Sequence, residues 1–220
     1  MKTNFKTSLE IPNVIIRDSN LNAVDFTILF KLKHLMFLHK SSDYEVDNNK
    51  LKFVLGIADN KTIKKSYAKL YESGYLLEPV TLIRGQPVRF ILNTQLICSK
   101  KNVSTSIPIN TLYYLPKIKY VGFRLLCYYS SLINQQLENQ GYAFPSIETI
   151  KKHLVIHKDT VINHNRLLEN EGLVRVERRN PQHDITHYIN GKLELAKLNN
   201  HYIVNFEKLK ESVNEYRSIS

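Results

Sequence analysis

The apolar residues in the first half of the chain repeat at helical spacing in three segments. Leucine, isoleucine and valine recur every three or four positions over residues 21–38, which predicts a long helix with a wide buried face. Asp47 is a suitable N-cap for a short helix that ends at Gly56. A third helix is expected over residues 60–73, because Gly74 suits the left-handed residue that follows many helices.

Short apolar runs, rich in β-branched residues, flank these helices and predict strands. They lie at residues 11–16, 75–77, 80–83 and 88–92. Residues 84–87, Arg-Gly-Gln-Pro, have the composition of a turn. The two runs on either side of this turn are therefore expected to form a hairpin.

The second half of the chain repeats this order. A long amphipathic helix is predicted over residues 120–137, and a short helix begins after the N-cap Ser146 and ends at residues 154–156. Another helix is expected over residues 159–171, closed by Gly172. The series ends with an alternating strand, a turn-rich loop and a returning strand, at residues 173–177, 178–184 and 185–189.

The two series lie about 96 to 98 residues apart, which indicates an internal repeat. The correspondence pairs Thr62 with Thr160, Leu70 with Leu168 and Gly74 with Gly172. We therefore expect a helix-rich α+β protein with two similar domains, joined by a polar linker and followed by a helical tail. These four parts are expected at residues 1–98 (first domain), 99–106 (linker), 107–195 (second domain) and 196–220 (tail).

Composition supports a folded, basic protein. The chain has 220 residues, of which 43% are hydrophobic, enough for packed cores and too many for a disordered chain. The formal net charge is +11. A basic balance of this size indicates an acidic partner, most often a nucleic acid. The alternative is a basic surface that only keeps the protein soluble.

The sequence lacks the usual features of secreted and membrane proteins. Cys98 and Cys127 lie among apolar residues and are expected to be reduced thiols in the core. Residues 1–9 are polar and lack the apolar run of a signal peptide. No segment reaches the ~18 to 20 apolar residues of a membrane helix. We therefore expect a cytoplasmic protein that does not enter the membrane.

The motifs of several enzyme classes are also missing from the sequence. It contains no GxxxxGK[ST] phosphate loop, no HExxH zinc motif and no His-x-His triplet. His153 and His157 are four residues apart, but a turn is expected between them and no third metal ligand accompanies them. We therefore expect a protein without enzymatic activity, cofactor or metal.

Three short segments of the second half resemble the winged helix-turn-helix pattern of bacterial regulators and of plasmid and phage replication proteins. FPSIETI resembles the start of the second helix of that pattern, DTVIN the start of its recognition helix, and ENEGLV its exit into the wing. These segments lie at residues 144–150, 159–163 and 169–174. Residues 47–92 resemble the same pattern more weakly.

The resemblance implies two tandem winged-helix domains, each with three helices and a β-hairpin wing, and it implies double-stranded DNA as the partner. Tandem winged helices of this length also resemble plasmid replication initiators. The implied function is therefore sequence-specific binding to the repeats of a plasmid or phage replication origin. Two alternatives stay open: a transcription regulator that binds an operator as a dimer, and a scaffold whose winged helices bind protein.

The expected recognition helix of the first copy has a lysine-rich outer face. Ile63, Tyr67 and Leu70 share one side at helical spacing and are expected to pack inward. Residues on the other side would meet DNA, with lysines holding phosphates. These candidates are Asn60, Lys61, Thr62, Lys64, Lys65 and Lys69. The alternative is a lysine face that only meets solvent.

In the second copy, Val161 and Leu168 are expected to pack inward, and the DNA-binding candidates are Lys158, Thr160, Ile162, Asn163 and Arg166. Asn163 is suited to pair with adenine, and Arg166 with guanine or a phosphate. The alternative for each is ordinary surface. His164 and Asn165 stand where the family places apolar residues. Either this helix is rotated, or these polar groups have partners inside.

Arginines mark both expected wings. Arg84 and Arg89 flank the first, and Arg178 and Arg179 begin the second. Wing arginines commonly enter the minor groove or hold the backbone. The alternative is a hairpin whose charged edge blocks further strand pairing.

The tail carries an apolar stripe at helical spacing. Its members are Phe206, Leu209, Val213 and Tyr216. Such a stripe indicates either a helix that docks on its own domain or a helix through which two copies form a homodimer.

Overall fold

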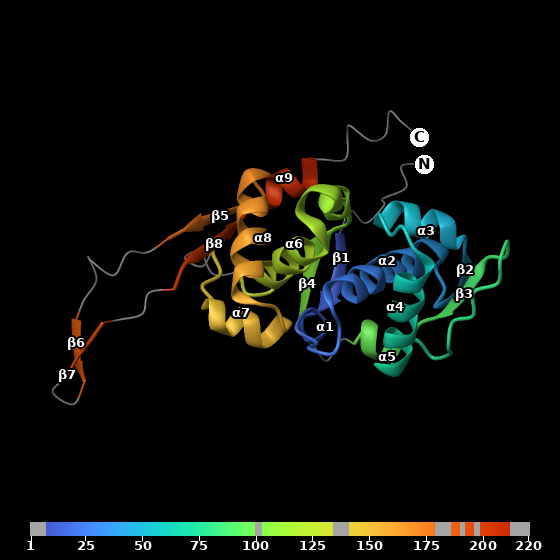
Figure 1. Cartoon of the computed structure of the whole chain (residues 1–220), viewed down its shortest axis with the longest axis horizontal. Coiled ribbons are helices and arrows are strands. Elements are labelled where there is room, and N and C mark those ends of the chain that lie inside the picture. The colour runs from blue at the N-terminus through green and yellow to red at the C-terminus, as the bar shows by residue number, and fades with distance from the viewer. Residues whose placement is uncertain are drawn as a thin grey trace.

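The structure is a computed structural model that describes residues 8–99, 103–133, 141–178, 186–189, 192–195 and 199–211. The described chain is an α+β protein, rich in helix, whose strands pair in small antiparallel sheets (Figure 1). The helix-rich α+β class expected from the sequence is confirmed.

The first half, residues 8–99, alternates short strands with helices. Its elements are β1 (Ser8–Pro12), α1 (Asn13–Ile16), α2 (Ala23–His39), β2 (Asp43–Val46), α3 (Asn48–Leu55), α4 (Asn60–Glu72), β3 (Val88–Ile91) and α5 (Thr94–Ile97). The expected caps are present: the Asp47 carboxylate accepts from the backbone N–H of Asn49 at 2.8 Å, and Gly56 and Gly74 have positive φ.

The second half, residues 103–211 as described, repeats this order with additions. Its elements are β4 (Ser104–Pro108), the 3₁₀ helix η1 (Ile109–Tyr114), α6 (Leu115–Ser130), α7 (Ile147–Leu154), α8 (Lys158–Asn170), β5 (Val174–Glu177), β6 (Thr186–Ile189), β7 (Lys192–Leu195), β8 (His201–Val204) and α9 (Phe206–Glu211). Ser146 caps α7 as expected, because its hydroxyl accepts from the backbone N–H of Thr149 at 3.0 Å.

An approximate two-fold axis relates the two halves. β1 and β4 pair antiparallel, with Glu10 opposite Ser106 at the middle of the ribbon. The equivalent helices α2 and α6 cross at the same axis, where the Phe26 and Phe123 rings lie 5.9 Å apart. In Figure 1 the axis points toward the viewer: α3 and α7 lie at opposite corners, as do α5 and α9.

The two halves share one hydrophobic core rather than two. Arg124 of α6 is 2% exposed and reaches across the axis into the loop between α1 and α2. Its guanidinium donates to the carbonyl oxygens of Ile16 at 3.2 Å, of Asp18 at 2.7 Å and of Leu21. Burial lowers the pKa of Arg124 to about 10. The expected linker is corrected in part, because residues 104–106 belong to β4.

The strand predicted over residues 80–83 is wrong. β3 pairs with β2 along its whole length, and on its other side only Leu76 forms a bridge, to Leu92. Pro79 follows that bridge closely and has no N–H for a ladder, so the chain leaves the sheet there. β2 was not predicted, although its alternation of exposed and inward residues buries Tyr44.

The strand predicted over residues 185–189 is present as β6, but its expected pairing with the strand at residues 173–177 is wrong. β6 pairs with β7, whereas the partner of β5 is β8, with Val174 opposite Val204. The fully helical tail expected after residue 195 is therefore corrected, since it begins with this strand. Leu209 of α9 is 1% exposed and packs within its own chain, which favours the docking alternative for the stripe. Val213 and Tyr216 lie outside the described residues.

Two further expectations differ from the structure. The helix predicted over residues 120–137 is preceded by a further helical turn that begins at Leu115, and the helix ends at Ser130 instead of residue 137. Lys119 interrupts it with φ of 62° and ψ of 172°, so the regular helix resumes at Tyr120. Cys98 is exposed rather than buried, whereas Cys127 is buried as expected and its pKa is raised by burial.

Candidate nucleic-acid interface

α4 presents the face that its sequence predicts. Ile63, Tyr67 and Leu70 are buried, and Lys61, Lys64 and Lys65 are exposed. The helix begins at the N-cap Asp59, whose carboxylate accepts from the backbone N–H and the hydroxyl of Thr62 at 2.6 and 2.8 Å. These hydrogen bonds lower the pKa of Asp59. Thr62 is therefore part of the cap, and the lysines carry the positive charge of this surface.

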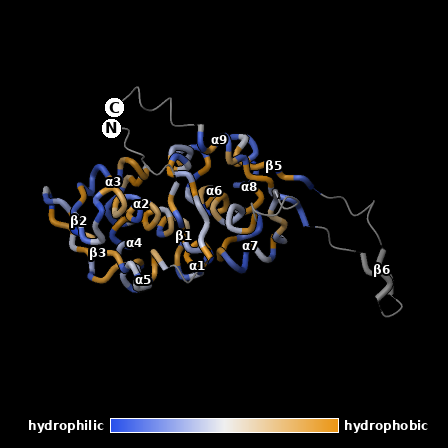
Figure 2. The backbone as a smooth tube through the Cα atoms, turned by 180° about the vertical axis from the view of Figure 1, so that it is seen from behind, coloured by the Kyte–Doolittle hydropathy of each residue, from blue (hydrophilic) through white to orange (hydrophobic). Residues whose placement is uncertain are grey.

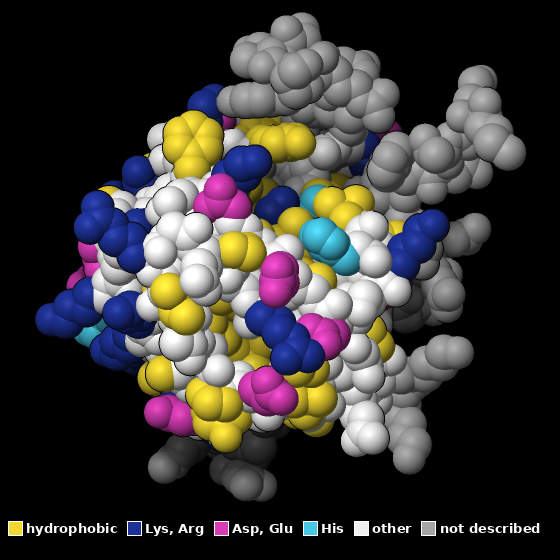
Figure 3. Space-filling model, turned by 90° about the vertical axis from the view of Figure 1, so that its right-hand side faces the viewer, with side chains coloured by type: hydrophobic (Ala, Val, Ile, Leu, Met, Phe, Trp, Pro, Cys, Tyr) yellow, Lys and Arg dark blue, Asp and Glu magenta, His cyan; other side chains and the backbone are white. Residues whose placement is uncertain are grey.

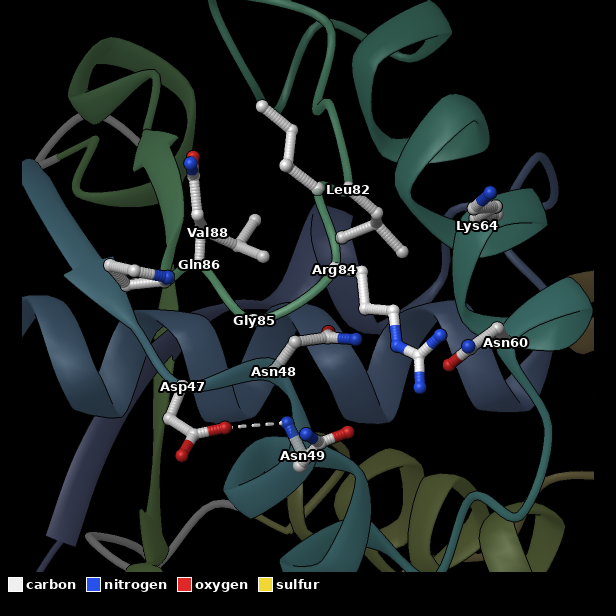
Figure 4. A pocket seen from close by; sticks show the side chains of 12 residues that line it. Asp47, Asn48, Asn49, Asn60, Lys64, Leu82, Arg84, Gly85, Gln86 and Val88 are labelled. Atoms are coloured by element: carbon white, nitrogen blue, oxygen red, sulfur yellow. Dashed lines mark hydrogen bonds between the residues drawn. The ribbon is translucent and has the colours of Figure 1, made fainter.

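A groove of about 590 Å³ separates the start of α4 from the loop that precedes β3. Asn60 and Lys64 line it from α4, Asn48 from α3 and Arg84 from the loop. Figure 4 shows the Arg84 side chain reaching toward Asn60. Sequence reasoning named Asn60, Lys64 and Arg84, and the structure brings these three together.

The groove is rich in hydrogen-bond donors. The amide oxygen of Asn60 accepts from the Lys52 ammonium at 2.7 Å, and that of Asn48 accepts from the Tyr67 hydroxyl at 2.8 Å. Each amide therefore keeps its NH₂ group as a donor, beside the cations Lys64 and Arg84. Such a set of donors suits the oxygens of a phosphate.

Sequence reasoning missed Asn48 and its neighbour Asn49, which also lines the groove. Their position in the sequence could have identified them, because they directly follow the N-cap Asp47 at the start of α3, the helix before α4.

The lysines of α4 do not form one continuous surface. Lys65 and Lys69 line a separate cleft that faces the second half of the chain. Lys69 also lies 3.8 Å from the Glu72 carboxylate, one turn away on the same helix. The expected lysine face is therefore split between the groove and this cleft.

α8 is the counterpart of α4. The buried residue Asn165 shows which side of α8 packs inward. Asn165 is 7% exposed, and its amide oxygen accepts from the Tyr129 hydroxyl at 2.8 Å. His164 is half-buried, with Nδ1 2.8 Å from the Thr160 carbonyl oxygen. The sequence left two alternatives open, a rotated helix or polar residues with partners inside the protein. Asn165 has such a partner.

With Asn165 inside, the opposite side of α8 faces outward. Lys158, Asn163 and Arg166 are exposed, whereas Thr160 and Ile162 are half-buried. This side carries fewer cations than α4, and its residue types are those that contact base edges.

Two of the expected wing arginines are engaged within the protein. Arg89 donates to the Asp43 carboxylate at 2.8 and 2.5 Å, which raises the pKa of Arg89 and lowers that of Asp43. Arg178 donates to Glu169 at 2.7 Å. Arg84 makes no ion pair within the described chain. Arg179 lies outside the described residues.

The charges of the first half are separated on its surface. Figure 3 shows Lys and Arg side chains gathered toward one edge of the end face, with Asp and Glu side chains nearer its middle. The acidic groups near Arg89 come from β2 and the loop after α4, and include Asp43, Glu45 and Glu78.

α4 and α8 lie on the same face of the molecule. Both are nearest to the viewer in Figure 1, one on each side of the two-fold axis. The β1–β4 ribbon crosses the opposite face, which Figure 2 shows from behind. The two candidate helices can therefore meet one elongated partner together.

Replacing Tyr129 with phenylalanine is expected to lower the free energy of unfolding by about 1 to 3 kcal/mol, because the buried Asn165 amide loses its donor. Urea unfolding followed by circular dichroism measures the change. The control Tyr71→Phe, at a tyrosine that is 42% exposed, is expected to change stability by less than about 0.5 kcal/mol. Equal effects of the two substitutions would show that the Tyr129–Asn165 contact does not stabilise the fold.

Comparison with the models of known protein families and with curated proteins finds no match to this chain. Within the described residues, no group of three or more His, Cys, Asp or Glu side chains could hold a metal ion. The described helices also include none whose length and apolar character would allow it to cross a bilayer.

Proposed function

We propose that the protein binds double-stranded DNA sequence-specifically, without enzymatic activity, through α4 and α8. Each helix would be the recognition helix of a winged-helix domain. The observation that carries the proposal is the placement of these two helices on one face, related by the two-fold axis, with a donor-rich groove beside α4.

The order of elements supports winged-helix domains. In the first half, three helices (α2, α3 and α4) are followed by the Leu76 bridge and β3, with β2 completing the small sheet. The second half has the same series, with Ala143 bridged to Tyr202 in the place of β2. In this reading the loop that carries Arg84 is the first wing, and the chain between β5 and β8 is the second.

The two-fold axis indicates how DNA would be bound. Duplex DNA has local two-fold axes perpendicular to its own axis, so a two-fold protein places equivalent helices in major grooves one turn apart. One chain would therefore contact two half-sites in inverted orientation. The contacted bases would still differ, because Lys64 and Lys65 of α4 correspond to Ile162 and Asn163 of α8.

This arrangement favours a plasmid or phage replication initiator over a transcription regulator. A regulator usually obtains two recognition helices by forming a dimer. Here a single chain carries both, so it can bind each repeat of an origin as a monomer. The proposed DNA site is bipartite, without a palindrome in its sequence.

Selection from random duplex DNA, followed by hydroxyl-radical footprinting and light scattering of the complex, tests the proposal. We expect one chain per site and two protected regions on one face of the DNA, about 10 to 10.5 base pairs apart. A palindrome bound by two chains would instead indicate the transcription regulator. Absence of any enriched sequence, with binding that disappears as salt rises, would indicate generic charge attraction.

A further inference from the structure

A second concave site lies between the two halves, apart from the groove of α4. This inter-half cleft has a volume of about 620 Å³ and is lined by Ala23, Lys65, Lys69, Val121, Leu154 and Ile156, among others. Its size is within the range of sites for small molecules, and such sites are frequent where domains meet.

The two-fold axis gives this cleft an equivalent position on the other side of the molecule. The two positions differ in one side chain. On that other side, the Tyr120 side chain at the start of the regular part of α6 fills the space, and its hydroxyl donates to the Leu55 carbonyl oxygen at 2.8 Å. The counterpart of Tyr120 is Ala23, the first residue of α2, and the counterpart of Leu55 is Leu154. The cleft is therefore open because the first half has Ala23 at the position where the second half has Tyr120.

The chemistry of the cleft combines an apolar wall with cations at its rim. Leu154 is buried, and Val121 and Ile156 are half-buried. The acids nearby are engaged: Asp25 accepts from the backbone N–H of Asn22 at 3.1 Å, and Glu72 pairs with Lys69. Lys65 is exposed and makes no ion pair in the described part of the chain. An apolar ring would meet the wall, and an acidic group would meet Lys65.

We propose that the inter-half cleft binds a small aromatic anion, with its ring in the place of the missing tyrosine and its acidic group at Lys65. Because Lys65 lies on α4, the bound anion would weaken DNA binding by neutralising this cation. That second effect rests on the function proposed above, whereas binding to the cleft does not.

The probe for this site is 8-anilinonaphthalene-1-sulfonate, an aromatic anion whose fluorescence rises in apolar surroundings. The full chain without DNA is expected to bind it at one main site. Ala23→Tyr fills the cleft and is expected to weaken binding at least tenfold, because the ring of the probe then has no space. Lys65→Gln is expected to weaken binding about fivefold, and Lys61→Gln, one turn earlier on α4 and not among the residues that line the cleft, to leave it unchanged.

Tyr120→Ala is the matched counterpart, because it opens the equivalent place on the other side of the axis. It is expected to add a second, weaker site for the probe, because the counterpart of Lys65 there is Asn163. Near-ultraviolet circular dichroism checks that each variant keeps its tertiary packing. Equal probe affinity in the unmodified chain and in Ala23→Tyr would overturn the proposed site, as would an equal effect of Lys61→Gln and Lys65→Gln.

Competition separates this proposal from the proposed function. If both hold, the probe lowers DNA affinity in the unmodified chain and has no such effect in Ala23→Tyr. Probe binding that Ala23→Tyr abolishes, in a protein that binds no DNA, would support the cleft and contradict the DNA-binding function.

Discussion

Replacing Arg124 with methionine is expected to lower the free energy of unfolding by about 3 to 5 kcal/mol, a large part of the ~5 to 15 kcal/mol typical of a folded domain. The guanidinium donates to three backbone carbonyls at the end of α1 and in the α1–α2 loop, those of Ile16, Asp18 and Leu21. Methionine fills much of the volume but donates nothing. These carbonyls would then lose a charged donor, and the hydrogen bonds to Ile16 and Leu21 are buried.

Urea unfolding at neutral pH measures this effect, and Arg166→Met is the matched control. Arg166 is exposed on α8, so the control is expected to change stability by less than about 0.5 kcal/mol. Because Arg124 joins the two halves across a shared core, the unmodified chain is also expected to unfold in a single transition. A loss below about 1 kcal/mol in Arg124→Met, or two separate transitions in the unmodified chain, would contradict this account of the junction.

The helices and their ends were predictable because their signals are local. The apolar spacing that buries Ile63, Tyr67 and Leu70 is contained within α4 itself. Gly74 and Gly172 close the two equivalent helices with positive φ, as glycine permits at low cost. The same signals, found in the same order in both halves, also revealed the repeat.

The strand partners were not predictable, because pairing depends on contacts between distant residues. The apolar run at residues 80–83 has the composition of a strand, yet β3 pairs with β2, which lies on the other side of two helices in the sequence. The pairing of β1 with β4 joins segments from different halves, and it was hidden in a stretch whose polar composition indicated a linker.

The candidate site was predictable in its residues more than in its arrangement. The exposure of Lys64 and Asn163 followed from helical spacing. The separation of Lys64 from Lys65 depends on the loop that carries Arg84 and on the turn after α7, and no local pattern places these segments. Asn165 looked misplaced because its partner, Tyr129, is on another helix.

Removing two cations from α4 is expected to weaken DNA binding about 10- to 100-fold near physiological salt, if the proposed function holds. The variant is Lys64→Gln with Lys65→Gln, since both lysines are exposed on this helix and Lys64 lines the donor-rich groove. The loss is expected on all DNA sequences alike, because phosphate contacts carry no base information. The slope of log affinity against log salt is negative, and each lost contact should make it shallower by about 0.9.

The control removes the same charge elsewhere, with Lys40→Asn and Lys210→Gln. Both lysines are exposed, at the end of α2 and on α9, and asparagine tolerates the positive φ of Lys40. Fluorescence anisotropy with a labelled duplex, at several salt concentrations, gives affinity and slope for both variants. Equal losses in the two variants would assign the effect to net charge alone. A loss confined to the α4 variant, with a salt slope that is shallower by about 1 to 2, would place these lysines against the DNA backbone.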